Sequence, residues 1–177
     1  MNRQWLEEQL SELPLYQYAF IDTADLLFSE RIRWICEHEC PMYGKTWACP
    51  PAVGTVEECR ARLEQYPHAL LIATITEVSD IANIEETLAT RPDHEEITRQ
   101  VHDLAKRQSR DTLVLSTEAC AVCEKCAYPD CPCRFPEKMY PCVESHGIVV
   151  TDLAEKTGID FYAAGNLVTW FSLIFYK

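Results

Sequence analysis

The sequence predicts an α/β fold: a single layered domain over residues 1–177 with a mixed central sheet and two cysteine-rich metal-binding loops. Segments with helical periodicity alternate with short apolar runs rich in β-branched residues, in the order β-α-β-α-β-α-β. Most of the ten cysteines fall in two groups at the ends of these elements. With 47% hydrophobic residues in a chain of 177, a sizeable core can form without disulfides.

Helix start and stop signals mark six helical segments. Ser29 and Thr55 are N-cap residues, and Thr55 is followed three residues later by the glutamate of a capping box. Pro14 ends the first segment, Pro92 divides the longest one and Gly158 caps the last. The predicted helices cover residues 4–13, 30–36, 55–66, two parts of 81–110 of which the second is 93–107, and 148–156.

Four apolar runs predict strands. They cover residues 16–21, 68–78, 112–116 and 167–176. The second run is rich in β-branched residues, which suits a buried strand. The last run is apolar at nearly every position, so we expect it to be buried on both faces. It could form a central strand or pair across a dimer, which leaves the oligomeric state open.

Cysteines are densest between residues 120 and 133, where five fall in fourteen residues. Cys120, Cys123 and Cys126 repeat at every third position, as in the ferredoxin motif that supplies three corners of an iron–sulfur cubane. A zinc site uses two cysteines of such a run and leaves the third without a role. The spacing then departs from the ferredoxin motif, so Cys131 and Cys133 are both candidates for a fourth ligand.

The second group consists of Cys36, Cys40 and Cys49 in a loop that prolines and Gly44 keep out of regular helix. Cys49 is followed by two prolines, which resembles the cysteine–proline ending of ferredoxin motifs. These three ligands also lack a fourth.

Ferredoxins suggest how both groups are completed, because the fourth cysteine of each run there binds the other cluster. Cys131 or Cys133 could then complete the Cys36 site. Cys133 is our first choice, since Pro132 turns the chain and Arg134 would place a cation beside a negatively charged cluster. A surface salt bridge is the alternative role for Arg134.

Several other side chains have plainer interpretations. Cys59 lies on a predicted helix and is interpreted as a packed thiol. Cys142 is either a ligand or a buried thiol. The isolated histidines His38 and His146 are possible ligands, but hydrogen bonding or exposure is the commoner role of such residues.

Trp34 and Ile35, on the helix that leads to the first cysteine group, are interpreted as core residues.

Charge and composition exclude several classes of function. The net charge of −12 works against nucleic-acid binding, which depends on clustered Lys and Arg. No apolar run is long enough to span a bilayer, and the first residues lack the apolar core of a secretory signal. Ten cysteines then indicate a reducing, cytoplasmic setting with metal-bound or free thiols. A redox partner protein would offer a basic docking face.

The two cysteine loops together resemble the uncharacterised "predicted metal-binding protein" family, domain of unknown function 2284. The resemblance rests on Cys36 to Pro51, Cys120 to Cys126, Pro132 to Pro136 and Glu144 to Ile148. It implies a cysteine-rich cytoplasmic metal or iron–sulfur protein without an assigned activity. The metal positions that it implies are Cys36, Cys40, Cys49, Cys120, Cys123, Cys126 and Cys133. Cys131 and Cys142 lie outside that pattern, and a serine is more usual at position 142.

The leading hypothesis is a protein that holds one or two 4Fe-4S clusters and has a redox or electron-transfer role. A zinc-binding structural or interaction module is the first alternative. The second is a redox enzyme that uses a free thiol, such as Cys142 or Cys59, beside a cluster.

Overall fold

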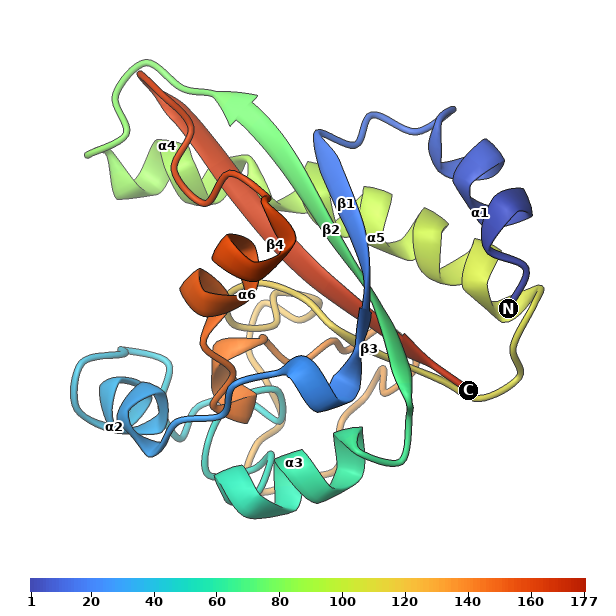
Figure 1. Cartoon of the computed structure of the whole chain (residues 1–177). Coiled ribbons are helices and arrows are strands. Elements are labelled where there is room, and N and C mark those ends of the chain that lie inside the picture. The colour runs from blue at the N-terminus through green and yellow to red at the C-terminus, as the bar shows by residue number, and fades with distance from the viewer.

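The computed structural model describes residues 1–177 and contains one four-stranded sheet. Its strand order is β1-β2-β4-β3, with the two long strands in the centre (Figure 1). The strands are β1 (Gln17–Asp22), β2 (His68–Glu77), β3 (Thr112–Leu115) and β4 (Leu167–Tyr176). The α/β fold class and all four strand positions are confirmed.

All three strand pairings are antiparallel, whereas the alternation of elements suggested a mixed sheet. The register of β1 on β2 gives the reason, because Asp22 at the end of β1 lies opposite His68 at the start of β2. The long segment between these residues therefore leaves and re-enters the sheet at the same end. It does not carry the chain back along the sheet, as a parallel connection must.

Six α-helices and two short 3₁₀ turns surround the sheet. They are α1 (Arg3–Leu10), α2 (Glu30–His38), α3 (Val56–Leu63), α4 (Ile84–Ala89), α5 (Arg91–Lys106), α6 (Val150–Thr157), η1 (Thr23–Asp25) and η2 (Glu144–His146). The predicted caps are confirmed: Ser29 accepts from the Arg31 amide, Thr55 forms the capping box, and Gly158 ends α6 in the left-handed conformation. None of the helices is long and apolar enough to cross a membrane.

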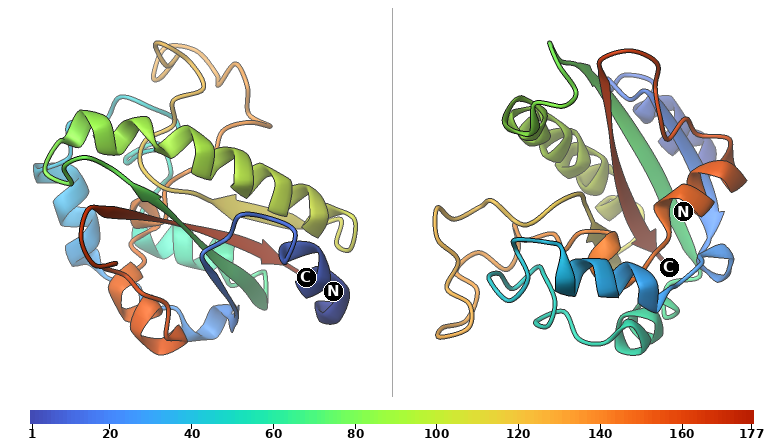
Figure 2. Two further views of the ribbon diagram at one scale, coloured as in Figure 1. Left: turned by 90° about the horizontal axis from the view of Figure 1, so that it is seen from above. Right: turned by 90° about the vertical axis from the view of Figure 1, so that its left-hand side faces the viewer.

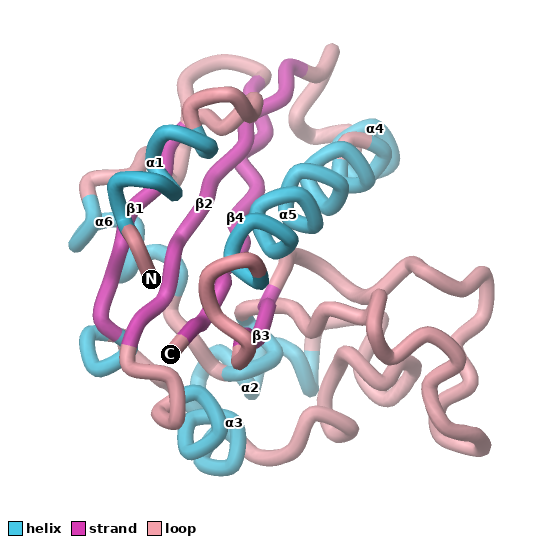
Figure 3. The backbone as a smooth tube through the Cα atoms, turned by 90° about the vertical axis from the view of Figure 1, so that its right-hand side faces the viewer, coloured by secondary structure: helices cyan, strands magenta, loops and turns pink.

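The helices form a layer on each face of the sheet. Figure 3 shows α1 and α5 in front of the strands, with α2, α3 and α6 behind them. Side chains of β2 alternate between the two layers, because Leu70 and Ile72 join the core under α1 and α5, while Leu71 and Ala73 join the core beside α3 and α6. A strand buried on both faces was the prediction for β4, and its last seven residues are all buried.

Two long loops carry most of the cysteines. Residues 39–55 connect α2 to α3, and residues 116–143 follow β3 and protrude from the body of the molecule (Figure 2). The loops touch each other, since the Trp47 indole donates a 2.9 Å hydrogen bond to the Cys131 carbonyl and packs edge-on against the Tyr128 ring.

The interpretation of Trp34 and Ile35 as core residues is wrong, because their exposed fractions are 50% and 40%. Helix α2 lies at the margin of the fold and buries a single residue, Arg33. It attaches to η2 through the guanidinium of Arg33 and not through an apolar stripe, so Trp34 and Ile35 remain exposed.

Candidate metal centres

Four cysteines of the protruding loop line one enclosed pocket. They are Cys120, Cys123, Cys126 and Cys133, here called the Cys120 group. The other lining residues are Trp47, Val122, Phe135 and Met139, so no charged side chain faces the pocket. The sulfurs are the only strong ligand atoms that line it, in an apolar surrounding that favours thiolate-bound metal over solvated metal.

The donor set fits a thiolate-bound metal centre. Around a single zinc ion each sulfur lies about 2.3 Å from the metal, but no three Cys, His, Asp or Glu side chains lie close enough together to hold one ion. The free volume of the pocket is about 20 Å³, so a cubane requires the four thiols to move outward. The loop over residues 116–143 contains no α-helix or strand.

Cys133 lies with the Cys120 group. Our first choice, in which Cys133 completes the Cys36 site, required it to lie with the first cysteine loop instead. The Arg134 guanidinium explains the position of Cys133, because it donates a 2.8 Å hydrogen bond to the Lys125 carbonyl. The bond folds the end of the loop back beside Cys126. Arg134 forms no salt bridge, which was its alternative role.

Cys131 is exposed and lies outside the enclosed pocket. It lines a neighbouring and more open cavity of about 500 Å³ together with Arg62 and with Trp47, Cys133 and Met139, which line the enclosed pocket as well. Its spacing from Cys126 made it a candidate ligand, but it is not among the residues that line the enclosed pocket.

Cys36, Cys40 and Cys49, here called the Cys36 group, lie at the end of α2 and in the loop that follows. Burial and, to a smaller extent, the neighbouring Cys40 and Glu144 raise the pKa of Cys36 to about 11. Burial also raises the pKa of Cys49. These thiols are protonated at neutral pH, so metal binding there must release protons.

The two cysteine groups are neighbours. Cys120 and Glu118 both lie close enough to Cys49 to raise the pKa of its thiol. Cys142 comes near the Cys36 group from another segment. Burial is the main cause of its raised pKa, and Glu144 and Cys49 lie close enough to raise this pKa further. The fold thus brings thiols from three segments to one side of the molecule.

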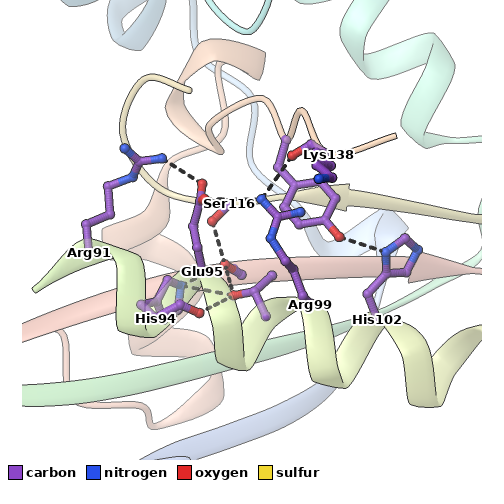
Figure 4. A network of polar contacts seen from close by, with 10 residues as sticks. Arg91, His94, Glu95, Arg99, His102, Ser116 and Lys138 are labelled. Atoms are coloured by element: carbon purple, nitrogen blue, oxygen red, sulfur yellow. Dashed lines mark hydrogen bonds and ion pairs between the residues drawn. The ribbon is translucent and has the colours of Figure 1, made fainter. Parts of the chain in front are cut away.

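A ladder of charged residues on α5 flanks the protruding loop (Figure 4). Glu95 accepts hydrogen bonds from Arg91 at 2.6 Å and from Arg99 at 3.3 Å, and Arg99 also donates to the Lys138 carbonyl at 3.0 Å. Burial is the main cause of the raised pKa of Cys120. The charge of Glu95 raises this pKa further, and the charge of Arg91 lowers it. The i,i+4 spacing could have indicated the ladder, but nothing in the sequence indicates which loop it faces.

A buried polar network links α5 to the start of the same loop. His94 contacts the hydroxyls of Thr74 at 2.8 Å and Ser172 at 2.7 Å, and Ser172 donates to the Ser116 hydroxyl at 3.2 Å (Figure 4). Burial lowers the pKa of His94 to about 4. The network fixes Ser116, the residue from which the cysteine loop departs.

The remaining candidates have structural roles. Cys59 is a packed thiol, as predicted: it is 0% exposed and donates to the Val53 carbonyl at 3.3 Å. The His38 ring stacks on Trp34 with 4.4 Å between centroids. His146 is buried beside the Ser145 hydroxyl, and burial lowers its pKa to about 3.

Comparison with known proteins gives one match. A family model described as "Predicted metal-binding protein (DUF2284)" matches residues 19–176. No curated protein and no solved structure matches the chain.

Proposed function

Because the chain belongs to the DUF2284 family of predicted metal-binding proteins, we propose that it binds a 4Fe-4S cluster through the Cys120 group and has an electron-transfer role. The observation that carries the proposal is that four thiols of one loop line a single enclosed pocket without a charged side chain. Their spacing supports iron–sulfur over zinc, since Cys120, Cys123 and Cys126 repeat in the ferredoxin manner.

When bound, such a cluster supplies one-electron oxidation and reduction. The chain contributes four thiolates, an apolar wall and a nearby cation. The Trp47, Phe135 and Met139 side chains exclude water from the pocket. Arg91 on α5 lies close enough to Cys120 to favour its anionic form.

We propose a second metal site at the Cys36 group. Its three thiols lie at the end of α2 and in the loop that follows, and Cys120 lies close enough to Cys49 to affect its thiol. Two metal sites held side by side suit the passage of electrons through the protein. Cys131 is not among the proposed ligands, since it is exposed and does not line the enclosed pocket.

The proposed setting is the cytoplasm, with a redox partner that presents a basic face. All ten cysteines are free thiols, which suits a reducing compartment. A net charge of −12 favours docking of a positively charged surface. Electron transfer between this protein and a basic redox partner that becomes faster at low ionic strength would support this kind of docking.

The test compares Cys123→Ser with Cys131→Ser after purification without oxygen. We expect Cys123→Ser to lose visible charge-transfer absorption and iron, because it removes one thiolate of the enclosed pocket. Cys131→Ser should keep both. Unchanged absorption and iron content in Cys123→Ser would contradict the assignment of Cys123 as a cluster ligand. A colourless wild-type protein that holds zinc would instead support the alternative of a zinc-binding structural module.

A further inference from the structure

Arg33 joins the three segments that meet at the Cys36 group. Its guanidinium donates a 2.6 Å hydrogen bond to the Gly54 carbonyl, at the end of the loop that carries Cys49. It also donates a 2.5 Å bond to the carbonyl of Ser145, three residues after Cys142. Arg33 is only 6% exposed, so these two bonds fix the segments against α2 in the protein interior.

Cys36 faces the same segments as Arg33. Residues three apart on a helix are neighbours on one face, so the side of α2 that meets η2 carries both Arg33 and Cys36. Glu144 in η2 lies close enough to Cys36 and to Cys142 to affect the thiol of each. Cys36 in α2 and Cys142 in the loop before η2 therefore both lie within electrostatic range of the Glu144 carboxylate.

The backbone holds Cys142 firmly in place. The Ser116 amide donates to the Pro141 carbonyl at 2.8 Å, and the Val143 amide donates to the Ser116 carbonyl at 2.9 Å. Cys142 is therefore clamped beside the end of β3 by a bond on each side. Its own sulfur accepts a 3.3 Å hydrogen bond from the Ser145 amide, a contact that stabilises a thiolate.

The other side chains that could complete the Cys36 group have different positions or contacts. Cys133 lines the enclosed pocket, Cys131 is exposed on the far loop, and the Cys59 thiol donates to the Val53 carbonyl in the core. The His38 ring stacks on Trp34. The His146 ring is buried beside Ser145.

We infer that Cys142 is the fourth thiolate of the Cys36 group, so that this site holds a second iron–sulfur cluster on Cys36, Cys40, Cys49 and Cys142. The inference rests on the proposed function and adds a ligand from a third segment of the chain. Each of the four thiols releases its proton when metal binds. The Ser145 amide then donates to the anionic Cys142 sulfur.

The test is iron and sulfide content of Cys142→Ala beside the wild type and Cys131→Ala, all purified without oxygen. We expect about eight iron and eight sulfide per wild-type chain, about four of each in Cys142→Ala, and the wild-type content in Cys131→Ala. Cys142→Ala with wild-type content overturns the inference, as does loss of the same metal from Glu144→Gln but not from Cys142→Ala. Wild-type protein without iron and sulfide contradicts the proposed function itself.

Differential alkylation of the wild type keeps the test independent of how the variant folds. Native protein is treated with iodoacetamide before and after metal removal by a chelator, and labelled peptides are quantified by mass spectrometry. We expect Cys142 to gain reactivity together with Cys36, Cys40 and Cys49, while Cys131 reacts in both samples. Equal labelling of Cys142 with and without metal overturns the inference.

Discussion

The guanidinium of Arg33 donates a 2.5 Å hydrogen bond to the carbonyl of Ser145, which links α2 to the η2 turn across 112 residues of sequence. Cys36 lies on the same face of α2, and Cys142 lies just before the turn. This bond ties the segment that carries Cys142 to the helix that carries Cys36. Arg33 is therefore a positioning residue for the second metal site that we propose.

Replacing Arg33 should therefore affect both stability and metal content. Arg33→Met leaves the carbonyls of Gly54 and Ser145 without their donor, so we expect about 3 kcal/mol less stability in urea unfolding and loss of metal from the Cys36 group. Arg31→Met, on the exposed face of the same helix, should change stability by less than about 0.5 kcal/mol. Equal effects of the two substitutions would show that the bonds of Arg33 do not organise this site.

Gly147 places the η2 turn against α3. Its φ is +76°, and a Cβ there would lie 2.9 Å from both Val56 methyl groups. We expect Gly147→Ala to cost about 3 kcal/mol, from left-handed strain together with this clash. Gly158 has a similar φ of +70° but open space around it, so Gly158→Ala should cost about 1 kcal/mol. Thermal unfolding of the two variants would separate clash from strain, and equal costs would contradict the close packing at Gly147.

The boundaries of the helices in this fold are determined by residues close to them in the sequence. Ser29, the Thr55 capping box, Pro92 and Gly158 each act within a few residues, so helix boundaries follow from them. The relative direction of two strands depends on the end of the sheet at which a long connection returns. No residue near either strand indicates that end. The exposure of Trp34 was missed for a similar reason, because a buried arginine attaches α2 to its neighbour.

The candidate site divides in the same way. The spacing of Cys120, Cys123 and Cys126 indicates one site, because those thiols are adjacent in the chain. The placement of Cys133 depends on a bond within its own loop, from Arg134 to the Lys125 carbonyl, and the placement of Cys142 depends on bonds between distant segments. The spacing of the cysteines encodes neither. The family match covers the chain from residue 19 to 176 and supports metal binding without identifying the metal.

Arg91 should tune the cluster that we propose at the Cys120 group. Its positive charge stabilises the more negative, reduced form of a nearby cluster, so Arg91→Gln should make the reduction potential more negative. Glu95, left with Arg99 as its one remaining cationic partner, would shift it in the same direction. Potentiometric titration followed by electron paramagnetic resonance measures the shift. Arg107→Gln, at the exposed end of α5, is the control and should leave the potential unchanged.

His94 should make stability depend on acid pH. Burial lowers its pKa from 6.5 to about 4, so the unfolded chain binds a proton that the folded chain does not between these values. The folded state is therefore undisturbed by His94 above pH 6.5 and loses stability as the pH falls from 6.5 towards 4. At about pH 5 the loss is about 2 kcal/mol. Urea unfolding of wild type and His94→Gln at about pH 7.5 and about pH 5 checks this, and identical pH dependence in the two proteins would contradict it.

Iron, sulfide and zinc content, measured with a visible spectrum on wild-type protein purified without oxygen, tests the central claim most directly. We expect iron and sulfide in nearly equal amounts, at about eight of each per chain, with broad charge-transfer absorption. Zinc in place of iron, with a featureless visible spectrum, would contradict the iron–sulfur assignment and leave the two cysteine groups as structural thiolate sites.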